Sequence, residues 1–423
     1  MDAAHDIAAQ MEAIGRRATA AARVLATASP ALKNKALLLL AQLLRTRGDV
    51  IAQANRKDLV AAEAAGMDAP RMDRLRLTDA VVEAMARACE EVAAQADPVG
   101  AIETMWKRPN GLMVGKMRIP LGVVAMIFES RPNVTVDSAV LCLKAGNAVI
   151  LRGGSEAIHS NLALAALLHE ALDTVGLPGD CAQVVATTDR AAVTALCKMD
   201  QYIDVMIPRG GEGLVRAVTQ AATMPVLKHY QGVCHCYVDK AADLEQALAI
   251  VYNGKCQRPG VCNALEAALV HAEVAQAFLP MLAKKLGGMG VEFRACPRAL
   301  PLLGSTAVPA QATDWGHEFH DLIMAVKVVD SMDDALDHIA AHGSNHTEVI
   351  CSRDHDTLMR FLREADASMV AANASSRFND GGELGLGAEI GISTSKLHAY
   401  GPMGATELTS TKFVVLGQGQ TRG

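Results

Sequence analysis

Apolar residues in the first part of the chain recur at every third or fourth position, with charged and polar residues between them. This spacing predicts consecutive amphipathic helices over residues 3–97. The densest apolar stretch, Ala36–Leu44, is expected to lie in a core, and Thr78 precedes a new periodic run in the position of a helix N-cap. The chain therefore opens with a helical segment.

Short strand-like runs replace the helical pattern from residue 98 onward. Pro109-Asn110-Gly111 separates two such runs, and this turn chemistry predicts a β-hairpin. Thr411–Leu416, near the other end of the chain, is also strand-like. Because a lone hairpin is only marginally stable, we expect these strands to pair with another segment or another subunit.

Strands and helices alternate through the rest of the chain. Gly122–Phe128 is a continuous apolar run of the kind that is buried in parallel sheets. Val136–Ala145 has a helical pattern and ends at Gly146, which suits a left-handed residue after a helix. The same alternation returns over residues 232–400. The sequence therefore predicts an α/β protein with two doubly wound parallel-sheet domains.

Composition and charge exclude several classes of function. The 423 residues are too many for one ordinary core, and the net charge of −6 with 3% aromatic residues argues against a nucleic-acid partner. No uncharged apolar stretch is long enough to predict a membrane span, and the acidic start Met1–Asp6 is unlike a signal peptide. The ten cysteines form no regular framework, which indicates reduced thiols in the cytoplasm.

Cys262 is the cysteine with the most informative surroundings. A helix-like run ends, by the pattern, at Gly254, and Arg258-Pro259-Gly260 then predicts a tight turn that presents the thiol. Lys255 and Arg258 would favour the thiolate, which is the reactive form of cysteine. The same pattern also fits an ordinary loop cysteine with a basic neighbour.

Two strand ends carry the features of anion sites. Arg152-Gly153-Gly154-Ser155 and Arg209-Gly210-Gly211 each place glycine between a strand and a helix, where backbone amides and the helix dipole attract anions. Arg152 suits a 2′-phosphate, and no acidic residue is recognised at the end of that strand, which favours NADP(H) over NAD(H). Neither loop matches G-x-G-x-x-G, so two ordinary turns are the alternative.

Several longer stretches together resemble a known family. They are Glu129–Asp137, Lys144–Asn147, Gln257–Asn263, Ala335–Glu348 and Gly387–Thr394. In these stretches the chain resembles the aldehyde dehydrogenase superfamily and, within it, the branch that reduces L-glutamyl 5-phosphate. The resemblance implies an aldehyde-dehydrogenase-like fold. The expected domains are an NADP-binding domain (1–104 and 122–231), a catalytic domain (232–395), and oligomerisation strands (105–121 and 405–423).

The resemblance also implies a reaction. NADPH would reduce L-glutamyl 5-phosphate to L-glutamate 5-semialdehyde, with release of phosphate through a thioester on Cys262, as the second step of proline biosynthesis. The backbone amide of Cys262 and the side chain of Asn133 would stabilise the oxyanion. The resemblance further implies a homodimer or larger homo-oligomer, and it allows for a contact with glutamate 5-kinase, which makes the acyl phosphate.

Further site residues follow from the same resemblance. Glu318 would hold the nicotinamide ribose, with an exposed acid near Trp315 as the alternative. The remaining cofactor residues would be Arg152, Gly153, Ser155, Arg209, Gly210 and Gly211, and the substrate residues would be Arg258, Ser393 and Thr394. Ser393 and Thr394 could instead cap a turn. The chain departs from the reductase pattern at Gly382–Leu386 and at Tyr400.

One absence separates the chain from hydrolytic aldehyde dehydrogenases. Those enzymes carry a Glu that activates water, whereas the segment Lys228–Cys234 has no carboxylate. This favours phosphate over water as the acyl partner. An oxidative aldehyde dehydrogenase that needs no phosphate, and a non-catalytic member of the superfamily, remain as alternatives.

A metal site is not predicted. His338, His342 and His346 are spaced as on one helix face, but Gly343-Ser344-Asn345 should end the helix before His346. The paired cysteines also lack the spacing of zinc ligands.

Overall fold

The structure, a computed structural model, describes residues 2–422, which form two compact units. Unit 1 contains the residues up to Lys228, Gly385–Gly391 and the residues from Met403 onward, and unit 2 contains His229–Leu384 and Ile392–Pro402. The sequence interpretation had placed 229–231 with the first unit and 385–391 with the second, whereas the structure has the reverse.

The first part of unit 1 is helical, as the periodicity predicts. The helices are α1 (Asp2–Leu25), α2 (Pro30–Thr46), α3 (Gly48–Ala64), α4 (Ala69–Leu75) and α5 (Asp79–Ala94). Thr78 is the N-cap of α5, since its hydroxyl accepts a hydrogen bond from the Val81 N–H at 3.3 Å. This confirms the predicted cap.

A four-stranded parallel sheet forms the centre of unit 1, in the order β5-β4-β3-β6. Its strands are β3 (Val123–Phe128), β4 (Ala148–Arg152), β5 (Ala182–Val184) and β6 (Val205–Arg209), and the helices that follow them are α6 (Val134–Lys144), α7 (Ile158–Val175), α8 (Ala191–Leu196) and α9 (Glu212–Ala221). Every residue of β3 is buried, as its apolar run predicts. The chain adds β4 and β5 on one side of β3 and then crosses to add β6 on the other side. The boundary between β3 and β6 is therefore a switch point, where open α/β sheets bind ligands.

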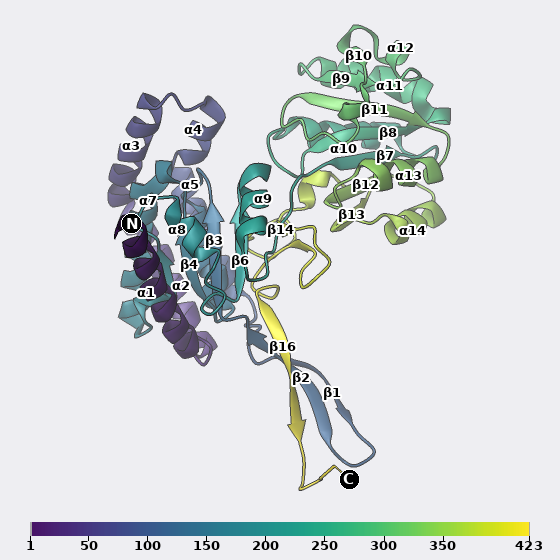
Figure 1. The fold of residues 1–423 in the computed structure, drawn as a ribbon. Coiled ribbons are helices and arrows are strands. Elements are labelled where there is room, and N and C mark those ends of the chain that lie inside the picture. The colour runs from purple at the N-terminus through teal and green to yellow at the C-terminus, as the bar shows by residue number, and fades with distance from the viewer. Residues whose placement is uncertain (1, 423) are drawn as a thin grey trace. The chain divides into compact units, whose positions relative to one another are not determined.

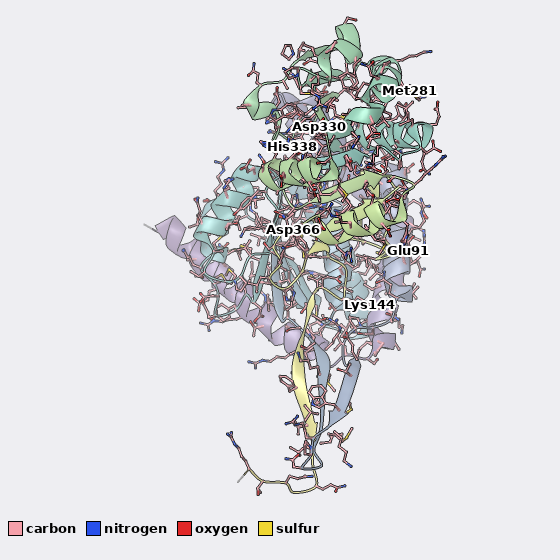
Figure 2. All side chains as sticks on the ribbon, turned by 90° about the vertical axis from the view of Figure 1, so that its right-hand side faces the viewer. Glu91, Lys144, Met281, Asp330, His338 and Asp366 are labelled. Carbon is pink, nitrogen blue, oxygen red and sulfur yellow. The ribbon has the colours of Figure 1, made fainter. Side chains whose placement is uncertain are left out.

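The end of α6 is fixed by a buried lysine. The ammonium of Lys144, which is labelled in Figure 2, donates to the carbonyls of Ala93 at 3.0 Å and Gln95 at 2.7 Å. The helix ends at Lys144, and Gly146 beyond its cap has φ +77°, which confirms the left-handed residue expected after the helix. Lys144 therefore ties the end of α6 to the end of α5.

Three antiparallel strands form a separate ribbon in unit 1: β1 (Ile102–Lys107), β2 (Met113–Pro120) and β16 (Thr409–Leu416). β2 is the central strand. One of its two partners is β16, near the end of the chain, with Thr409 opposite Pro120 and Leu416 opposite Met113. The predicted hairpin and terminal strand are confirmed. In Figure 1 the ribbon extends away from the parallel sheet of the same unit.

Unit 2 is built on a seven-stranded parallel sheet in the order β10-β9-β11-β8-β7-β12-β13. The strands are β7 (Cys234–Val238), β8 (Leu265–His271), β9 (Glu292–Ala295), β10 (Ala307–Pro309), β11 (Ile323–Val329), β12 (Thr347–Cys351) and β13 (Met369–Ala372), with a small pair β14 (Ile392–Ser393) and β15 (Gly401–Pro402). The helices are α10 (Leu244–Cys256), α11 (Ala272–Gly287), α12 (Leu300–Leu303), α13 (Met332–His342) and α14 (His355–Glu364). The two predicted doubly wound sheets are thus present (Figure 1). Within residues 2–422, no helix has the length and apolar character needed to cross a membrane.

The two faces of the unit 2 sheet are covered by different helices. Cys236 and Val238 of β7 pack toward α10 and α11, whereas Tyr237 packs toward α13 and α14. A fully buried polar pair lies on the face of Tyr237, with His235 Nδ1 and Glu348 Oε2 at 3.1 Å. Burial raises the pKa of the Glu348 carboxyl, and His235 acts against this effect. The pair joins adjacent strands, since His235 lies opposite Glu348 in the β7–β12 register.

Candidate active site

The loop that carries Cys262 begins later than the sequence predicts. Helix α10 passes through Gly254 and ends at Cys256. Gly254 packs closely against its neighbours, because an added Cβ would lie 3.2 Å from Leu265 Cβ and 3.3 Å from Ser376 Oγ. The prediction that the helix stops at Gly254 is therefore wrong, and the turn to Cys262 occupies only the residues after Cys256.

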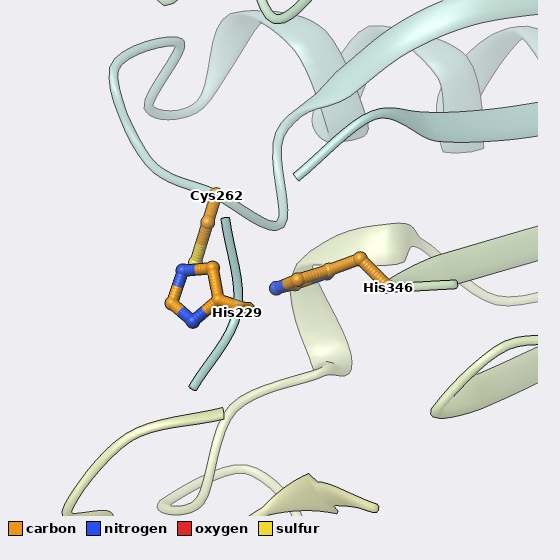
Figure 3. Close-up of side chains that lie close together, drawn as sticks. All are labelled: His229, Cys262 and His346. Atoms are coloured by element: carbon orange, nitrogen blue, oxygen red, sulfur yellow. The ribbon is translucent and has the colours of Figure 1, made fainter. Parts of the chain in front are cut away.

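Two histidines from distant segments lie beside the half-buried Cys262 thiol. His229 begins unit 2, and His346 immediately precedes β12. One ligand atom from each of His229, Cys262 and His346 lies within 4.8 Å of the others (Figure 3). The thiol is therefore placed within reach of two imidazoles.

Hydrogen bonds orient both imidazole rings. His229 Nδ1 lies 2.9 Å from the Ile392 carbonyl oxygen, which can only accept, so Nδ1 carries a proton, and Nε2 is directed to the thiol (Figure 3). His346 Nδ1 lies 2.8 Å from Thr347 Oγ1, and the nitrogen at the far end of the ring points toward the other two side chains (Figure 3). The Asn379 amide donates to the His346 carbonyl at 3.2 Å and to Thr347 Oγ1 at 2.8 Å, which holds this segment in place.

These imidazoles change the acidity of the thiol. Burial alone would raise the pKa of Cys262, but the charge of His346 and hydrogen bonds from His229 and His346 outweigh it. Together they hold the pKa of Cys262 well below its ordinary value. A thiolate at neutral pH is the form required of a nucleophilic cysteine.

Lys255 does not have the role that its position in the sequence predicts. Its ammonium forms a buried ion pair with Glu266, Nζ to Oε2 at 2.7 Å, so the prediction that it stabilises the thiolate is wrong. Arg258 is exposed on the loop. Sequence reasoning found Cys262 but missed His229 and His346. One feature of the sequence could have indicated His229, because it lies in the segment Lys228–Cys234, where hydrolytic aldehyde dehydrogenases carry their Glu.

The segment that follows His229 packs tightly against the Cys262 loop. An added Cβ on Gly232 would lie 2.0 Å from the Cys262 carbonyl oxygen. The Cys234 thiol donates to the same oxygen at 3.3 Å, and burial raises the pKa of Cys234 well above its ordinary value. Cys234 is therefore a protonated thiol that supports the loop, beside a thiolate that can react.

The segment Lys228–Cys234 does contain a group that can act as a base, the imidazole of His229. It has no carboxylate, as the sequence states, but His229 brings an imidazole nitrogen to the thiol. An imidazole can also activate water. The absence of Glu alone is therefore insufficient to exclude hydrolysis, and phosphate dependence must be measured.

In unit 1, the first predicted anion loop is closed by internal hydrogen bonds. The Arg152 guanidinium donates to the carbonyls of Gly153 at 2.6 Å and Thr188 at 3.0 Å, while its Nε is buried without a hydrogen-bond partner. An acidic residue is present beside this loop, because the Glu156 carboxylate accepts from the Ser130 N–H at 2.7 Å and the Ser130 hydroxyl at 2.6 Å. The sequence interpretation recognised no acidic residue at the end of this strand that would select a free ribose, and Glu156 is the carboxylate in the loop that follows it.

The second predicted anion loop already holds carboxylates. The Gly211 N–H donates to Glu129 Oε2 at 2.9 Å, and Arg209 Nη2 lies 2.9 Å from Glu389 Oε1. An added Cβ on Gly210 would lie 2.4 Å from Glu129 Oε2. The start of α9 therefore attracts an anionic group from the protein itself, as expected of a helix N-terminus.

Asn133 lies at the start of α6, after the carboxyl end of β3. Its amide donates to Asp137 Oδ2 at 2.9 Å. Burial raises the pKa of the Asp137 carboxyl to about 6, against the opposing effects of Asn133 and Arg209. Asp137 thus fixes the orientation of the Asn133 amide.

The remaining predicted residues of unit 2 have defined surroundings. The Ser393 hydroxyl accepts from the Ser395 N–H at 3.2 Å, which is the turn-capping arrangement, and Thr394 is half-buried beside it. The Glu318 side chain is only 8% exposed and lies 3.3 Å from His320 Nε2, so the alternative of an exposed acid is wrong. The Tyr400 hydroxyl donates to Asp366 at 3.1 Å.

The three histidines that shared one helical spacing are separated. Helix α13 ends at His342 with Gly343 as its cap, which confirms that His346 lies outside the helix. His338, on α13, lies 3.0 Å from the Lys327 ammonium, and burial lowers the pKa of His338 to about 3 (Figure 2). His338 is therefore a neutral core residue, and only His346 reaches the thiol.

Comparison with known proteins agrees with this fold and site. Residues 1–294 match the model of the aldehyde dehydrogenase family. The chain is 70% identical to a gamma-glutamyl phosphate reductase of Nitratidesulfovibrio vulgaris (99% of this chain, 100% of the relative) and 53% identical to one of Meiothermus ruber (98% and 99%). The crystal structure of gamma-glutamyl phosphate reductase from Thermotoga maritima is 42% identical and superimposes with a TM-score of 0.94, covering 98% of this chain and 100% of that chain.

A more distant structure shares the fold alone. An acetylating aldehyde dehydrogenase of Geobacillus thermoglucosidasius is 18% identical, with a TM-score of 0.74 and full coverage of both chains. The family model covers more than half of this chain, and the reductases of the two bacteria match it almost end to end. The chain therefore belongs to the aldehyde dehydrogenase family and, within it, to the gamma-glutamyl phosphate reductases.

Proposed function

We propose that this chain catalyses the NADPH-dependent reduction of L-glutamyl 5-phosphate to L-glutamate 5-semialdehyde, the second step of proline biosynthesis. The observation that carries the proposal is the Cys262 thiolate between His229 and His346. The relatives that bear the reductase name cover nearly the whole chain. Together these findings support an oxidoreductase that forms a covalent intermediate on cysteine.

The chemistry proceeds in two stages on Cys262. The thiolate attacks the acyl carbon of L-glutamyl 5-phosphate, the acyl–phosphate bond breaks, and inorganic phosphate leaves, so that a thioester remains. Reduction of the thioester gives a thiohemiacetal. His229 or His346 then accepts the hydroxyl proton, the carbon–sulfur bond breaks, and the aldehyde leaves with regeneration of the thiolate.

An oxyanion forms in both stages, on the same carbonyl oxygen. We assign its stabilisation to the backbone N–H of Cys262 and to the Asn133 side chain. Asp137 occupies one hydrogen-bonding position of the Asn133 amide, which leaves the other N–H of that amide for the substrate. Donors held in this way stabilise developing charge without reorganising during the reaction.

NADPH is the proposed cofactor, and unit 1 is its proposed binding domain. When bound, it supplies the hydride that reduces the thioester. The switch point between β3 and β6 is where open α/β sheets bind ligands, and the carboxylate held by the Gly211 N–H indicates that the start of α9 attracts anionic groups such as the phosphates of a dinucleotide. The buried Arg152 Nε adds a donor in the loop of Gly153 and Ser155. Glu156 lies near this loop, so the preference for NADPH over NADH is to be measured. Glu318 is the proposed ligand of the nicotinamide ribose.

The amino-acid end of the substrate is assigned to unit 2. Arg258 remains the proposed carboxylate ligand, with Ser393 and Thr394 as polar neighbours. Arg377 is a further candidate, since its guanidinium interacts electrostatically with both Arg258 and the Cys262 thiol. The product is a small molecule, and contact with glutamate 5-kinase, assembly into a homo-oligomer and a cytoplasmic location belong to the same proposal. The ten cysteines are all free, which fits a reducing compartment.

The reverse reaction provides the decisive test. L-Glutamate 5-semialdehyde and NADP+ are incubated with and without inorganic phosphate, and NADPH formation is followed for the wild type, Cys262→Ser and Cys256→Ser. We expect turnover only with phosphate, a loss of roughly 10³-fold or more in Cys262→Ser, and wild-type rates in Cys256→Ser, whose thiol lies outside the cluster.

Two outcomes would overturn the proposal. Equal turnover without phosphate would show that water is the acyl partner, with His229 as its base, and the chain would be an oxidative aldehyde dehydrogenase. Retention of activity in Cys262→Ser would exclude the thioester.

A further inference from the structure

The active-site thiol and its two imidazoles form a set of metal-ligand atoms. Cys262 Sγ and one nitrogen each of His229 and His346 lie within 4.8 Å of one another. Among residues 2–422, this is the one group of three or more metal-ligating side chains with such spacing. The sequence predicts no metal site because the three residues come from segments far apart in the chain.

We propose that His229, Cys262 and His346 bind one divalent ion of the Zn²⁺ class, with one thiolate and two imidazole ligands and a fourth position open. Thiolate and imidazole are the ligands that such borderline-soft ions prefer. Three protein ligands with one open position are typical of zinc sites that exchange their fourth ligand. This inference concerns ion binding to the resting site and does not rest on the proposed reduction.

The tautomers of the imidazoles favour this assignment. The His229 Nδ1–H is bound to the Ile392 carbonyl, and His346 Nδ1 is paired with Thr347 Oγ1. In metal sites the second ring nitrogen of a histidine ligand is held in this way by a carbonyl or another oxygen, which fixes the ring and directs the first nitrogen to the ion. His346 Nε2 is buried and directed toward the thiol (Figure 3), so the neutral ring with its proton on Nδ1 offers a lone pair to an ion at that position.

Other groups of thiols and imidazoles in unit 2 lack these features. Cys236 and Cys351 lie 3.7 Å apart, sulfur to sulfur, but no third ligand joins them. His338 and His342 lie together, but the Lys327 ammonium is 3.0 Å from His338 Nδ1 and would repel a cation. The three-residue set at Cys262 is therefore distinguished by its three convergent ligand atoms.

The test measures binding directly. The protein is dialysed free of metal and titrated with Co²⁺, whose thiolate-to-cobalt charge-transfer absorption reports a sulfur ligand, and with Zn²⁺ by equilibrium dialysis. We expect one ion per chain and a charge-transfer band in the wild type and in Cys256→Ser. We expect affinity to fall about 100-fold or more in Cys262→Ser and His346→Gln. Zn²⁺ should also protect Cys262 from iodoacetamide.

A second arm avoids dependence on the variants' folding. Wild-type protein is alkylated at Cys262 with iodoacetamide and titrated in the same way, and it should lose both the band and the stoichiometric ion. Unchanged ion binding after alkylation would overturn the proposal. So would the absence of a charge-transfer band in the unmodified wild type.

Discussion

At the scale of single residues, the central feature is a buried negative charge held by two imidazoles. Burial opposes the Cys262 thiolate, and the surrounding histidines more than compensate for it. Their Nδ1 atoms are bound to the Ile392 carbonyl and to the Thr347 hydroxyl, which hold the two rings in place beside the sulfur.

The first prediction concerns the reactivity of Cys262 toward iodoacetamide. An ordinary thiol has a pKa of about 8.5 and is only about 1% thiolate at pH ~6.5, whereas Cys262 should remain reactive there. In His346→Gln we expect the alkylation rate at pH ~6.5 to fall by about 10-fold or more, because the charge of the imidazole is lost. The rate is measured by mass spectrometry across a pH series. Identical profiles in the two proteins would contradict the assigned role of His346.

The second prediction concerns Asp137, whose pKa is raised by burial from 3.8 to about 6. Because the folded state disfavours the charged carboxyl, the stability of the wild type relative to Asp137→Asn should fall as the pH rises from about 4 through 6, and then level off. Urea unfolding of both proteins at several pH values measures this difference. A difference that is independent of pH would show that Asp137 does not titrate in this range.

The same substitution should affect catalysis through Asn133. With the carboxylate replaced by an amide, only one of its two terminal atoms can accept from the Asn133 amide, so the orientation of that amide is less firmly fixed. We expect kcat to fall by about 10-fold, which is less than the roughly 10²-fold or greater loss expected for Asn133→Ala, where an oxyanion donor is removed. Steady-state kinetics of the two variants test this order.

Much of the site chemistry could be predicted from sequence, but its electrostatics could not. The turn before Cys262 singled out the nucleophile. Lys255 was assigned to the thiol because it is near in sequence, yet its position on α10 directs it to Glu266 on the neighbouring strand. His346 approaches the thiol only through the pairing of β7 with β12, which a single sequence does not specify.

At the scale of elements, the segment from His229 to Cys234 acts as the support for the Cys262 loop. It supplies an imidazole, a thiol donor and a glycine against which the loop backbone packs. Any side chain at Gly232 would displace the carbonyl of Cys262 and, with it, the adjoining amide that is assigned to the oxyanion.

The third prediction uses this contact. Gly232→Ala places a Cβ 2.0 Å from the Cys262 carbonyl oxygen, and since backbone must shift, we expect activity to fall by about 10-fold or more. Gly213→Ala is the matched control. It lies in α9 with no atom within 4 Å of the added Cβ, and should raise stability by up to about 1 kcal/mol without loss of activity. Kinetics and thermal unfolding of both variants distinguish these results.

Element types were the most predictable part of the fold. Continuous apolar runs such as Gly122–Phe128 became buried parallel strands, because both faces of such a sheet are covered by helices. Helix ends were less predictable where glycine had a packing role, as at Gly254. The order of the seven strands in unit 2 depends on long-range pairing, and local pattern does not determine it.

At the scale of the whole molecule, the ribbon of β1, β2 and β16 carries exposed apolar side chains. Phe413, Val415 and Leu416 are between 54% and 65% exposed. Apolar residues grouped on an open strand are typical of surfaces that pair with another chain.

The fourth prediction is that the chain assembles through this ribbon. Light scattering at micromolar concentration should give a mass of at least two 44.5 kDa chains. Phe413→Asp should weaken the assembly, whereas Val60→Asp, which changes an equally exposed residue on α3, should leave it intact. A monomeric mass for the wild type would exclude the oligomer.

The buried pair of His235 and Glu348 has a consequence for folding fidelity. Sliding β12 by one residue along β7 would turn Glu348 toward the apolar helices α10 and α11 and leave His235 facing Val349. The Glu348 carboxyl would then be buried among apolar side chains without its partner, and the cost of burying it would destabilise the misaligned sheet. Replacing both residues with apolar ones could preserve stability yet permit slipped chains, in which His346 no longer meets Cys262. The pair thus favours the native register of β12 on β7, on which the position of His346 beside Cys262 depends.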